Sequence, residues 1–249
     1  MQTLVSPRET DHNLSEWAQA SLREFRSRMT DQDNLFPCIF GVEAVVRGTL
    51  RYAFISSKGD QASNLATALQ DYTEICDSLG KRTSLVCFFE HWAEEKTHEA
   101  YFQHFWQLLN DTSELDTKPW PAEFSPKPDE ASFEYSFNDH PMFVVINTEL
   151  HENRLSRAFS RVAVTFQPRF VFDDIREGTT KGDDARTIIR GRLKDYDNVD
   201  ITPLLGSFGD ESNREWKQYY LDDGTDIEQA TECPVKNFVS GHQQVWSRT

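Results

Sequence analysis

Residues 151–157 carry one histidine and two arginines at helical spacing. Arg154 and Arg157 follow His151 at offsets of three and six, so a helical turn would place all three side chains on one side. A neutral imidazole binds iron or zinc, and guanidinium groups bind carboxylates in bidentate fashion. A haem needs an iron ligand and partners for two propionates, which this segment could supply. A surface histidine beside a solvated basic turn is the simpler interpretation, and spacing alone favours it.

Two further residues are candidate iron ligands. Cys38 lies in the apolar segment 36–41, where a thiol usually packs as a small hydrophobic group with a raised pKa. Haem iron also accepts a Cys thiolate, so ligation by Cys38 stays open. His140 directly precedes Pro141, and a turn residue is the simpler interpretation of that position.

Spacing argues against several other kinds of site. His98 and His104 are six residues apart, which does not match a pair of zinc ligands on one helix face. The glycines stand singly, without the patterns of phosphate-binding loops, and no G-x-S-x-G nucleophile elbow occurs. The acidic run 222–226 begins like an EF-hand loop, but Cys233 stands where that loop requires glutamate.

Charge and composition limit the partners and the compartment. The 249 residues carry a net charge of −15, which disfavours nucleic-acid phosphates and anionic membranes as partners. A local basic pocket, such as one built by Arg154 and Arg157, remains compatible with that charge. The sequence has no apolar run long enough to span a membrane, no secretory leader and no C-x-x-C pair among its four cysteines. We therefore expect a soluble cytoplasmic protein with reduced thiols.

The apolar pattern predicts an α/β (α+β) fold of one domain, with helices packed on a central mixed, largely antiparallel sheet. We expect a disordered N-terminus over 1–12, the domain over 13–238 and a tail over 239–249. Pro37 favours an irregular packed segment at 36–41. The predicted strands are 50–55, 84–89, 132–137, 142–147 and 163–172. The predicted helices are 13–29, 61–79, 97–109, 183–196 and a short one after a capping box at 212–215.

Two of these strands, 142–147 and 163–172, flank the segment that carries His151. Strands are rigid, so they would hold a site in the segment between them. The polar turn 138–141 joins 132–137 to 142–147 as an antiparallel hairpin.

Several strings resemble the YqcI/YcgG family in order from about residue 33 to residue 234. They are Phe36-Pro37-Cys38-Ile39-Phe40-Gly41, Leu50-Arg51-Tyr52-Ala53-Phe54, Lys118-Pro119-Trp120-Pro121, His151-Glu152-Asn153-Arg154-Leu155-Ser156-Arg157, Phe166-Gln167-Pro168-Arg169-Phe170-Val171-Phe172 and Asn213-Arg214-Glu215-Trp216-Lys217-Gln218-Tyr219. The last string is specific. Near the C-terminus, Cys233-Pro234-Val235 departs from the Cys-Pro-Phe ending of the family.

The resemblance implies a cofactor and a chemistry. Several members of the wider family are haem-dependent N-oxygenases that hydroxylate guanidino nitrogens or oxidise amino groups. By resemblance, haem b would be held by His151 as the iron ligand, with Arg154, Arg157, Cys38 and His140 as further cofactor-binding candidates. No flavin or nicotinamide motif is present, so electrons would come from an external donor or from peroxide.

Three hypotheses follow. The first is a haem-dependent N-oxygenase that uses dioxygen or peroxide on a small nitrogenous substrate, either arginine-like or an amino-azole. The alternative is a haem- or small-ligand-binding protein without turnover. The third is a structural protein whose pocket has lost its ligand. The sequence leaves the substrate, the electron donor and the oligomeric state open, a homodimer included.

Overall fold

A five-stranded sheet in the order β1-β2-β5-β4-β3 forms the centre of the computed structural model, which describes residues 4–6, 14–175, 178–207, 210–224 and 231–241. β1 and β2 are parallel, and the other neighbours are antiparallel. The predicted mixed, largely antiparallel sheet is therefore confirmed. The strands are β1 (Arg51–Ile55), β2 (Leu85–Phe89), β3 (Ser136–Phe137), β4 (His140–Asn147) and β5 (Ala163–Pro168).

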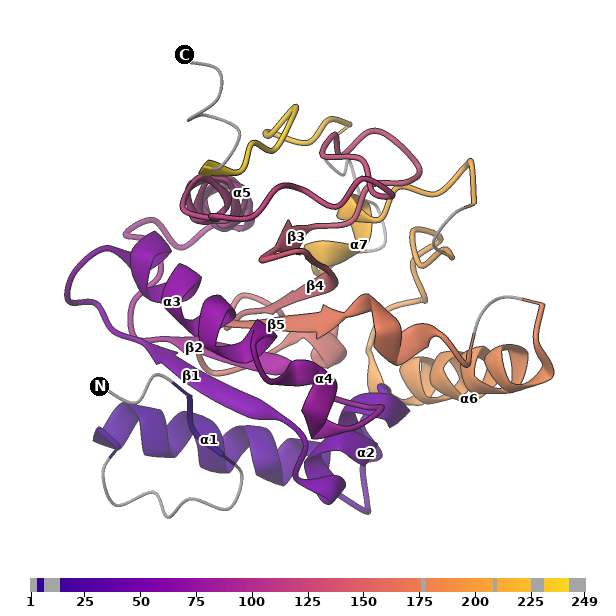
Figure 1. Cartoon of the computed structure of the whole chain (residues 1–249). Coiled ribbons are helices and arrows are strands. Elements are labelled where there is room, and N and C mark those ends of the chain that lie inside the picture. Colours follow the sequence, from indigo (N-terminus) through magenta and orange to yellow (C-terminus); the bar gives the residue numbers. More distant parts are fainter. Residues whose placement is uncertain (1–3, 7–13, 176–177, 208–209, 225–230, 242–249) are drawn as a thin grey trace.

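Helices cover both faces of this sheet in the described part of the chain (Figure 1). They are α1 (Glu16–Met29), α2 (Ile39–Arg47), α3 (Gln61–Thr73), α4 (Cys76–Leu79), α5 (His98–Glu114), α6 (Thr180–Tyr196) and α7 (Trp216–Tyr219). Two short 3₁₀ turns, η2 (Leu155–Arg157) and η3 (Arg169–Phe172), precede and follow β5. Among these described helices, none is both long and apolar enough to cross a membrane.

Side chains on opposite faces of the strands enter two separate cores, because successive residues of a strand alternate between faces. The larger core packs α3 and α5 against one face, with Val144, Ile146 and Phe166 at its centre. The smaller core packs α1 and α2 against the other face, around Tyr52 and Phe88. Figure 1 shows α3 and α5 above the sheet and α1 below it.

Local capping explains where three of the helices begin. The side chains of Asp60, Thr97 and Thr179 each accept a backbone N–H bond three residues later, at the starts of α3, α5 and α6. Such a cap satisfies one of the N–H groups that have no partner inside the helix. The predicted helix 97–109 thus begins directly after its cap, Thr97, whereas α6 begins at Thr180 rather than at 183.

Several predicted boundaries are wrong. The segment 36–41 is not irregular throughout, because α2 begins at Ile39, two residues after Pro37. The predicted helix 61–79 is broken between Thr73 and Cys76, and α5 continues past residue 109 to Glu114. Only Ser136 and Phe137 of the predicted strand 132–137 pair with β4. The predicted strand 163–172 ends at Pro168, after which the chain turns into η3.

The predicted hairpin between β3 and β4 is confirmed. Asn138 and Asp139 form its turn with φ angles of 51° and 64°, as in the type I′ turns that suit the twist of paired strands. Near the N-terminus, Val5 pairs with Tyr52 of β1 through backbone bonds of 2.8 and 3.1 Å. Residues 1–3 and 7–12 of the predicted disordered segment lie outside the described residues, so the domain boundaries stay predictions.

Candidate functional site

A cavity of about 860 Å³ lies on the sheet face that α1 and α2 cover. This volume is within the range of sites for small molecules and cofactors. Cross-strand pairs of β4 and β5 form its floor: Phe143 opposite Gln167, Val145 opposite Thr165, and Asn147 opposite Ala163. Alternation sends the residues between them into the larger core. The two strands that the sequence singled out therefore form the floor of a cavity.

Charged side chains around the cavity are mainly cationic. Three carboxylate residues line it, namely Asp173, Asp197 and Glu215. Twice as many arginines do so: Arg28, Arg154, Arg157, Arg169, Arg186 and Arg190. In a chain with a net charge of −15, this is a local reversal of sign. The cavity can therefore attract anionic groups that the rest of the surface repels.

The predicted arginine pair lies at this cavity on the η2 turn. Both side chains reach across to the segment 218–224. Arg154 donates to the carbonyls of Asp222 and Gly224 at 2.8 and 3.1 Å. Arg157 donates to those of Tyr219 and Gln218 at 3.2 and 3.0 Å. These bonds use two of the five N–H groups of each guanidinium, so donors remain for an anion.

The cationic character of Arg157 survives its burial. The side chain is only 8% exposed, and burial, reinforced by the charge of Arg154, lowers its pKa to about 10. It therefore stays charged at neutral pH, although its hydrogen bonds above go to neutral carbonyls. Such a charge favours an anionic ligand in the cavity.

Carboxylates outside the cavity floor hold the η2 turn in place. Asp197 accepts hydrogen bonds from the backbone N–H and the hydroxyl of Ser156, at 2.6 and 2.9 Å. Asp223 accepts from the backbone N–H of Arg154 at 2.7 Å. The turn is thus fixed at both ends by charge-assisted bonds.

Cys38 lies at the cavity wall, where it is the N-cap residue of α2. Its sulfur accepts the backbone N–H of Gly41 at 3.3 Å. A Cβ on Gly41 would lie 2.9 Å from Met29 Cε and 3.4 Å from Cys38 Sγ, so glycine permits this close approach. Burial raises the pKa of the Cys38 thiol, while the N–H of Gly41 and the charge of Arg157 oppose that shift. Cys38 therefore lines the cavity as a residue whose net pKa shift favours the neutral thiol, although Gly41 and Arg157 reduce that shift.

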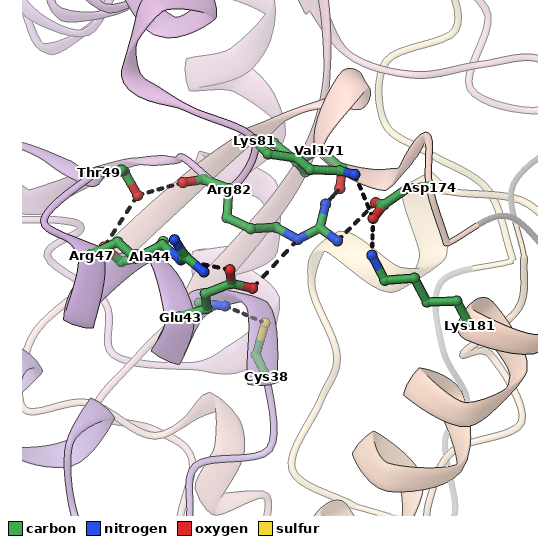
Figure 2. A network of polar contacts seen from close by, with 11 residues as sticks. Cys38, Glu43, Ala44, Arg47, Thr49, Lys81, Arg82, Val171, Asp174 and Lys181 are labelled. Carbon is green, nitrogen blue, oxygen red and sulfur yellow. Dashed lines mark hydrogen bonds and ion pairs between the residues drawn. The ribbon is translucent and has the colours of Figure 1, made fainter.

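An ion-pair network around the buried Arg82 links α2 to α6 (Figure 2). Arg82 is 4% exposed and lies 2.8 Å from Asp174 and 3.8 Å from Glu43 of α2. Lys81, at 2.7 Å, and Lys181 of α6 bind the same Asp174 carboxylate. Burial alone would raise the pKa of Asp174, but its hydrogen bonds from Lys181, Lys81 and Arg82 hold the pKa well below its usual range. The network thus fixes the helix that carries Cys38.

His151 lies outside the cavity lining and is 4% exposed. Its Nε2 bonds the carbonyl of Leu221 at 2.7 Å, and its Nδ1 bonds the hydroxyl of Thr148 at 2.8 Å. A carbonyl can only accept, so Nε2 carries the proton and Nδ1 accepts. Burial lowers the pKa of the ring to about 4. In this arrangement neither nitrogen offers a lone pair to iron, and the ring instead joins the 148–151 turn to Leu221.

His140 also lies outside the cavity, at the start of β4. Its Nδ1 bonds the carbonyl of Asn138 at 2.8 Å. Its ligand atom and those of Cys76 and Asp77 all lie within 4.8 Å of one another. Among the three predicted axial ligands, only Cys38 reaches the cavity. Metal binding by His140 would involve this separate cluster.

Glu134, Glu215 and Arg169 form a buried charged group that sequence reasoning missed. The predicted capping box led us to expect the Glu215 side chain at the start of α7, but it makes no cap bond there. It faces Arg169 instead. The signal was available in the specific string 213–219, which contains Glu215.

One known protein family matches most of this chain. The model of the YqcI/YcgG family matches residues 25–236. The chain belongs to the YqcI/YcgG family. Two Bacillus subtilis (strain 168) members, the uncharacterized proteins YcgG and YqcI, are each 39% identical over 89% of this chain and 88% of their own length. No solved structure matches the chain.

A third relative carries a functional name. DcsA of Streptomyces lavendulae is 29% identical over 93% of this chain and 88% of its own length, and it is named provisionally as an N(omega)-hydroxy-L-arginine synthase. The floor of the cavity, the arginine turn and Cys38 all lie within residues 25–236, which the family model matches.

The residues that line the cavity can be compared with what the haem implied by the resemblance would require, and they include Cys38 but not His151. A haem requires an apolar slot, an iron ligand and cationic partners for its propionates. The slot is lined by Phe25, Phe143 and Phe159, the sulfur of Cys38 lies at its wall, and Arg154 and Arg157 retain N–H donors. His151 and His140 do not contribute to this set.

Proposed function

We propose that the protein is a haem-dependent N-oxygenase that hydroxylates a guanidino nitrogen of an arginine-like substrate. The observation that carries the proposal is the arginine-lined cavity with Cys38 at its wall. The name of the relative DcsA supports the choice of reaction. In this proposal, Cys38 holds the iron, and Arg154 and Arg157 bind the propionates. Iron ligation by His151 stays a prediction, which would require its ring to leave Leu221 and Thr148.

The chemistry sets what else the reaction needs. Bound haem supplies the activation of dioxygen. One oxygen atom enters an N–H bond of the substrate, and the other leaves as water with two electrons and two protons. An external reductase provides these electrons, or peroxide replaces both dioxygen and electrons. The role of the chain is to exclude water through the aromatic lining and to hold the substrate nitrogen in place.

An absorption spectrum of protein purified with haem supplied tests the cofactor. We expect a Soret band in the wild type and in His151→Ala, and its loss or shift in Cys38→Ala. Cys76→Ala is the matched control, because Cys76 is a buried free thiol that does not line the cavity. A wild-type protein that takes up no haem would contradict the proposal, and loss of the band in His151→Ala alone would assign the iron to that ring.

Turnover is measured by incubating the haem-loaded protein with L-arginine and dioxygen plus a reductase, or with peroxide. Mass spectrometry should detect a product that has gained one oxygen atom, at a rate that Cys38→Ala greatly reduces. A haem spectrum without any oxidised product would instead favour a haem-binding protein without turnover.

A further inference from the structure

Two buried carboxylates meet at one guanidinium on the cavity wall. Glu134 precedes β3, Glu215 precedes α7, and Arg169 opens η3. Arg169 Nη1 lies 3.4 Å from Glu134 Oε1 and 3.9 Å from Glu215 Oε1. Glu134 is fully buried, and Glu215 is 4% exposed. Glu215 and Arg169 line the cavity, and Glu134 stands behind them.

The charges of this group do not balance. Two ionised carboxylates and one guanidinium leave an excess negative charge, which is costly in a buried place. Within the described residues, Glu134 Oε2 has no hydrogen-bond partner. Glu215 Oε2 accepts only a 3.2 Å bond from Gln218 Nε2, an amide donor that carries no charge. The pair is therefore short of one positive charge or one proton.

The pKa of each carboxyl group is shifted in the direction that this count requires. Burial raises the pKa of Glu134 to about 8, against the opposing charge of Arg169, and raises that of Glu215 to about 7. The other charged or titratable groups that face the pair in the described chain are Arg169 and the Tyr219 hydroxyl, whose own pKa burial raises well above its usual value. At neutral pH the pair thus holds about one proton, which a bound cation could replace.

The surroundings suit a planar cation. Phe143 and Phe172 line the same part of the cavity and meet edge to face at 6.3 Å. The guanidinium of Arg169 already lies over the Phe172 ring, 5.5 Å from its centroid. Aromatic faces and a carboxylate together form the usual environment of a guanidinium group.

We propose that Glu215, backed by Glu134, anchors the cationic guanidinium of the substrate and that binding releases the proton that this buried pair holds. The identity of the cation rests on the proposed function, through the name of DcsA. The released proton passes to the solvent, and no bond of the substrate changes. Arg169 is the positioning residue that holds Glu215 at the cavity and Glu134 beside it.

Calorimetric titration of the haem-supplied, full-length protein with L-arginine and L-citrulline tests the anchor. Citrulline has the same shape but a neutral urea group. We expect the wild type to prefer arginine by about 10- to 100-fold, as for hydrogen bonds to charged groups. Glu215→Gln and Glu134→Gln should each remove most of this preference. Glu149→Gln is the matched control, since Glu149 is a part-buried glutamate that does not line the cavity.

Proton release gives a readout that a merely structural pair would not show. Titrations in buffers of different ionisation enthalpy should reveal release of up to one proton on arginine binding near pH 7, and none in Glu215→Gln. Wild-type affinity for arginine should rise as the pH increases from 6 to 8, because the pair then loses its proton, while affinity for citrulline stays constant. The wild-type pH dependence needs no variant, so it tests the anchor even if a variant fails to fold.

The outcomes separate this proposal from the proposed function. Equal wild-type affinities for arginine and citrulline, or an unchanged preference in both Gln variants, would overturn the anchor even if oxidised arginine is formed. Arginine-selective binding with proton release but without haem uptake or product would retain the anchor and overturn the oxygenase.

Discussion

Hydrogen bonding leaves the sulfur of Cys38 able to bind a metal, whereas it occupies both ring nitrogens of His151. Both ring nitrogens of His151 are occupied by Leu221 and Thr148, so metal binding would require breaking two buried bonds. The sulfur of Cys38 accepts one N–H and still borders the cavity. Sulfur has capacity for that bond and a metal together, as thiolate ligands commonly accept N–H bonds. For metal binding, a lone pair that is free to bind the metal therefore matters more than the type of residue.

Because His151 is buried and hydrogen-bonded in its neutral form, the free energy of unfolding should depend on acid pH. The ring titrates at about 4 in the folded protein, against a reference value of 6.5. Between these values the unfolded chain binds more protons, so the free energy of unfolding should fall as the pH drops from 6.5 to 4. We expect His151 to account for about 2–3 kcal/mol of this loss. Denaturant titrations of the wild type and His151→Gln across this pH range measure it.

The variant His151→Gln should be less stable than the wild type at pH 7 but should lose less stability on acidification. His91→Gln serves as the control, because the His91 side chain is 50% exposed. Parallel pH profiles for the wild type and His151→Gln would contradict the structural role of the ring.

At the scale of elements, the ion pairs around Asp174 should contribute to the free energy of unfolding. Asp174→Asn removes the charge that Arg82, Lys81 and Lys181 share and leaves the buried Arg82 guanidinium poorly paired. We expect the free energy of unfolding to fall by about 1.5–3 kcal/mol. Chemical denaturation monitored by circular dichroism measures the change.

Lys181→Ala is the matched control for the network. The Lys181 side chain is 61% exposed, and exposed ion pairs contribute about 0–1 kcal/mol. If Asp174→Asn proves no more costly than Lys181→Ala, the network does not hold α2 in the way described here.

Sequence patterns could predict the strands and most helices, but not α2. Continuous apolar runs revealed β4 and β5, because strands that are covered on both faces are apolar along their length. Pro37 suggested an irregular segment, yet a proline before the N-cap is compatible with a helix that begins at Ile39. The break between Thr73 and Cys76 was not visible, because the apolar face of the predicted helix continues across it.

At the scale of the molecule, the cavity predicts stabilisation by its ligand. A cofactor that binds only the folded chain adds about 2.7 kcal/mol at a free concentration of 100 times its Kd. For a chain of this size, the melting temperature should then rise by about 5–10 °C. Differential scanning calorimetry with and without haem should show this rise in the wild type and in Cys76→Ala. An equal rise in Cys38→Ala would contradict ligation by Cys38.

The candidate site could be predicted only in part, because its members meet through tertiary packing. The sequence located Arg154 and Arg157 by local spacing, and the structure places both at the cavity. It could not reveal that the carbonyl of Leu221 accepts a hydrogen bond from His151 Nε2. Nor could it reveal that Glu134 and Glu215 both lie close to the guanidinium of Arg169. These partners lie far apart along the chain, and no periodicity connects them.

Side chains of β4 and β5 alternate between the cavity and the larger core, so substitutions at the two sets of positions have different effects. Val145, Asn147 and Thr165 face the cavity, whereas Val144 and Phe166 belong to the larger core. A substitution on the cavity side can change the shape offered to a ligand while the packing on the opposite side stays intact. Relatives could therefore diverge in the molecule they accept through a few alternate positions, at little risk to folding, and a directed library should vary those positions first.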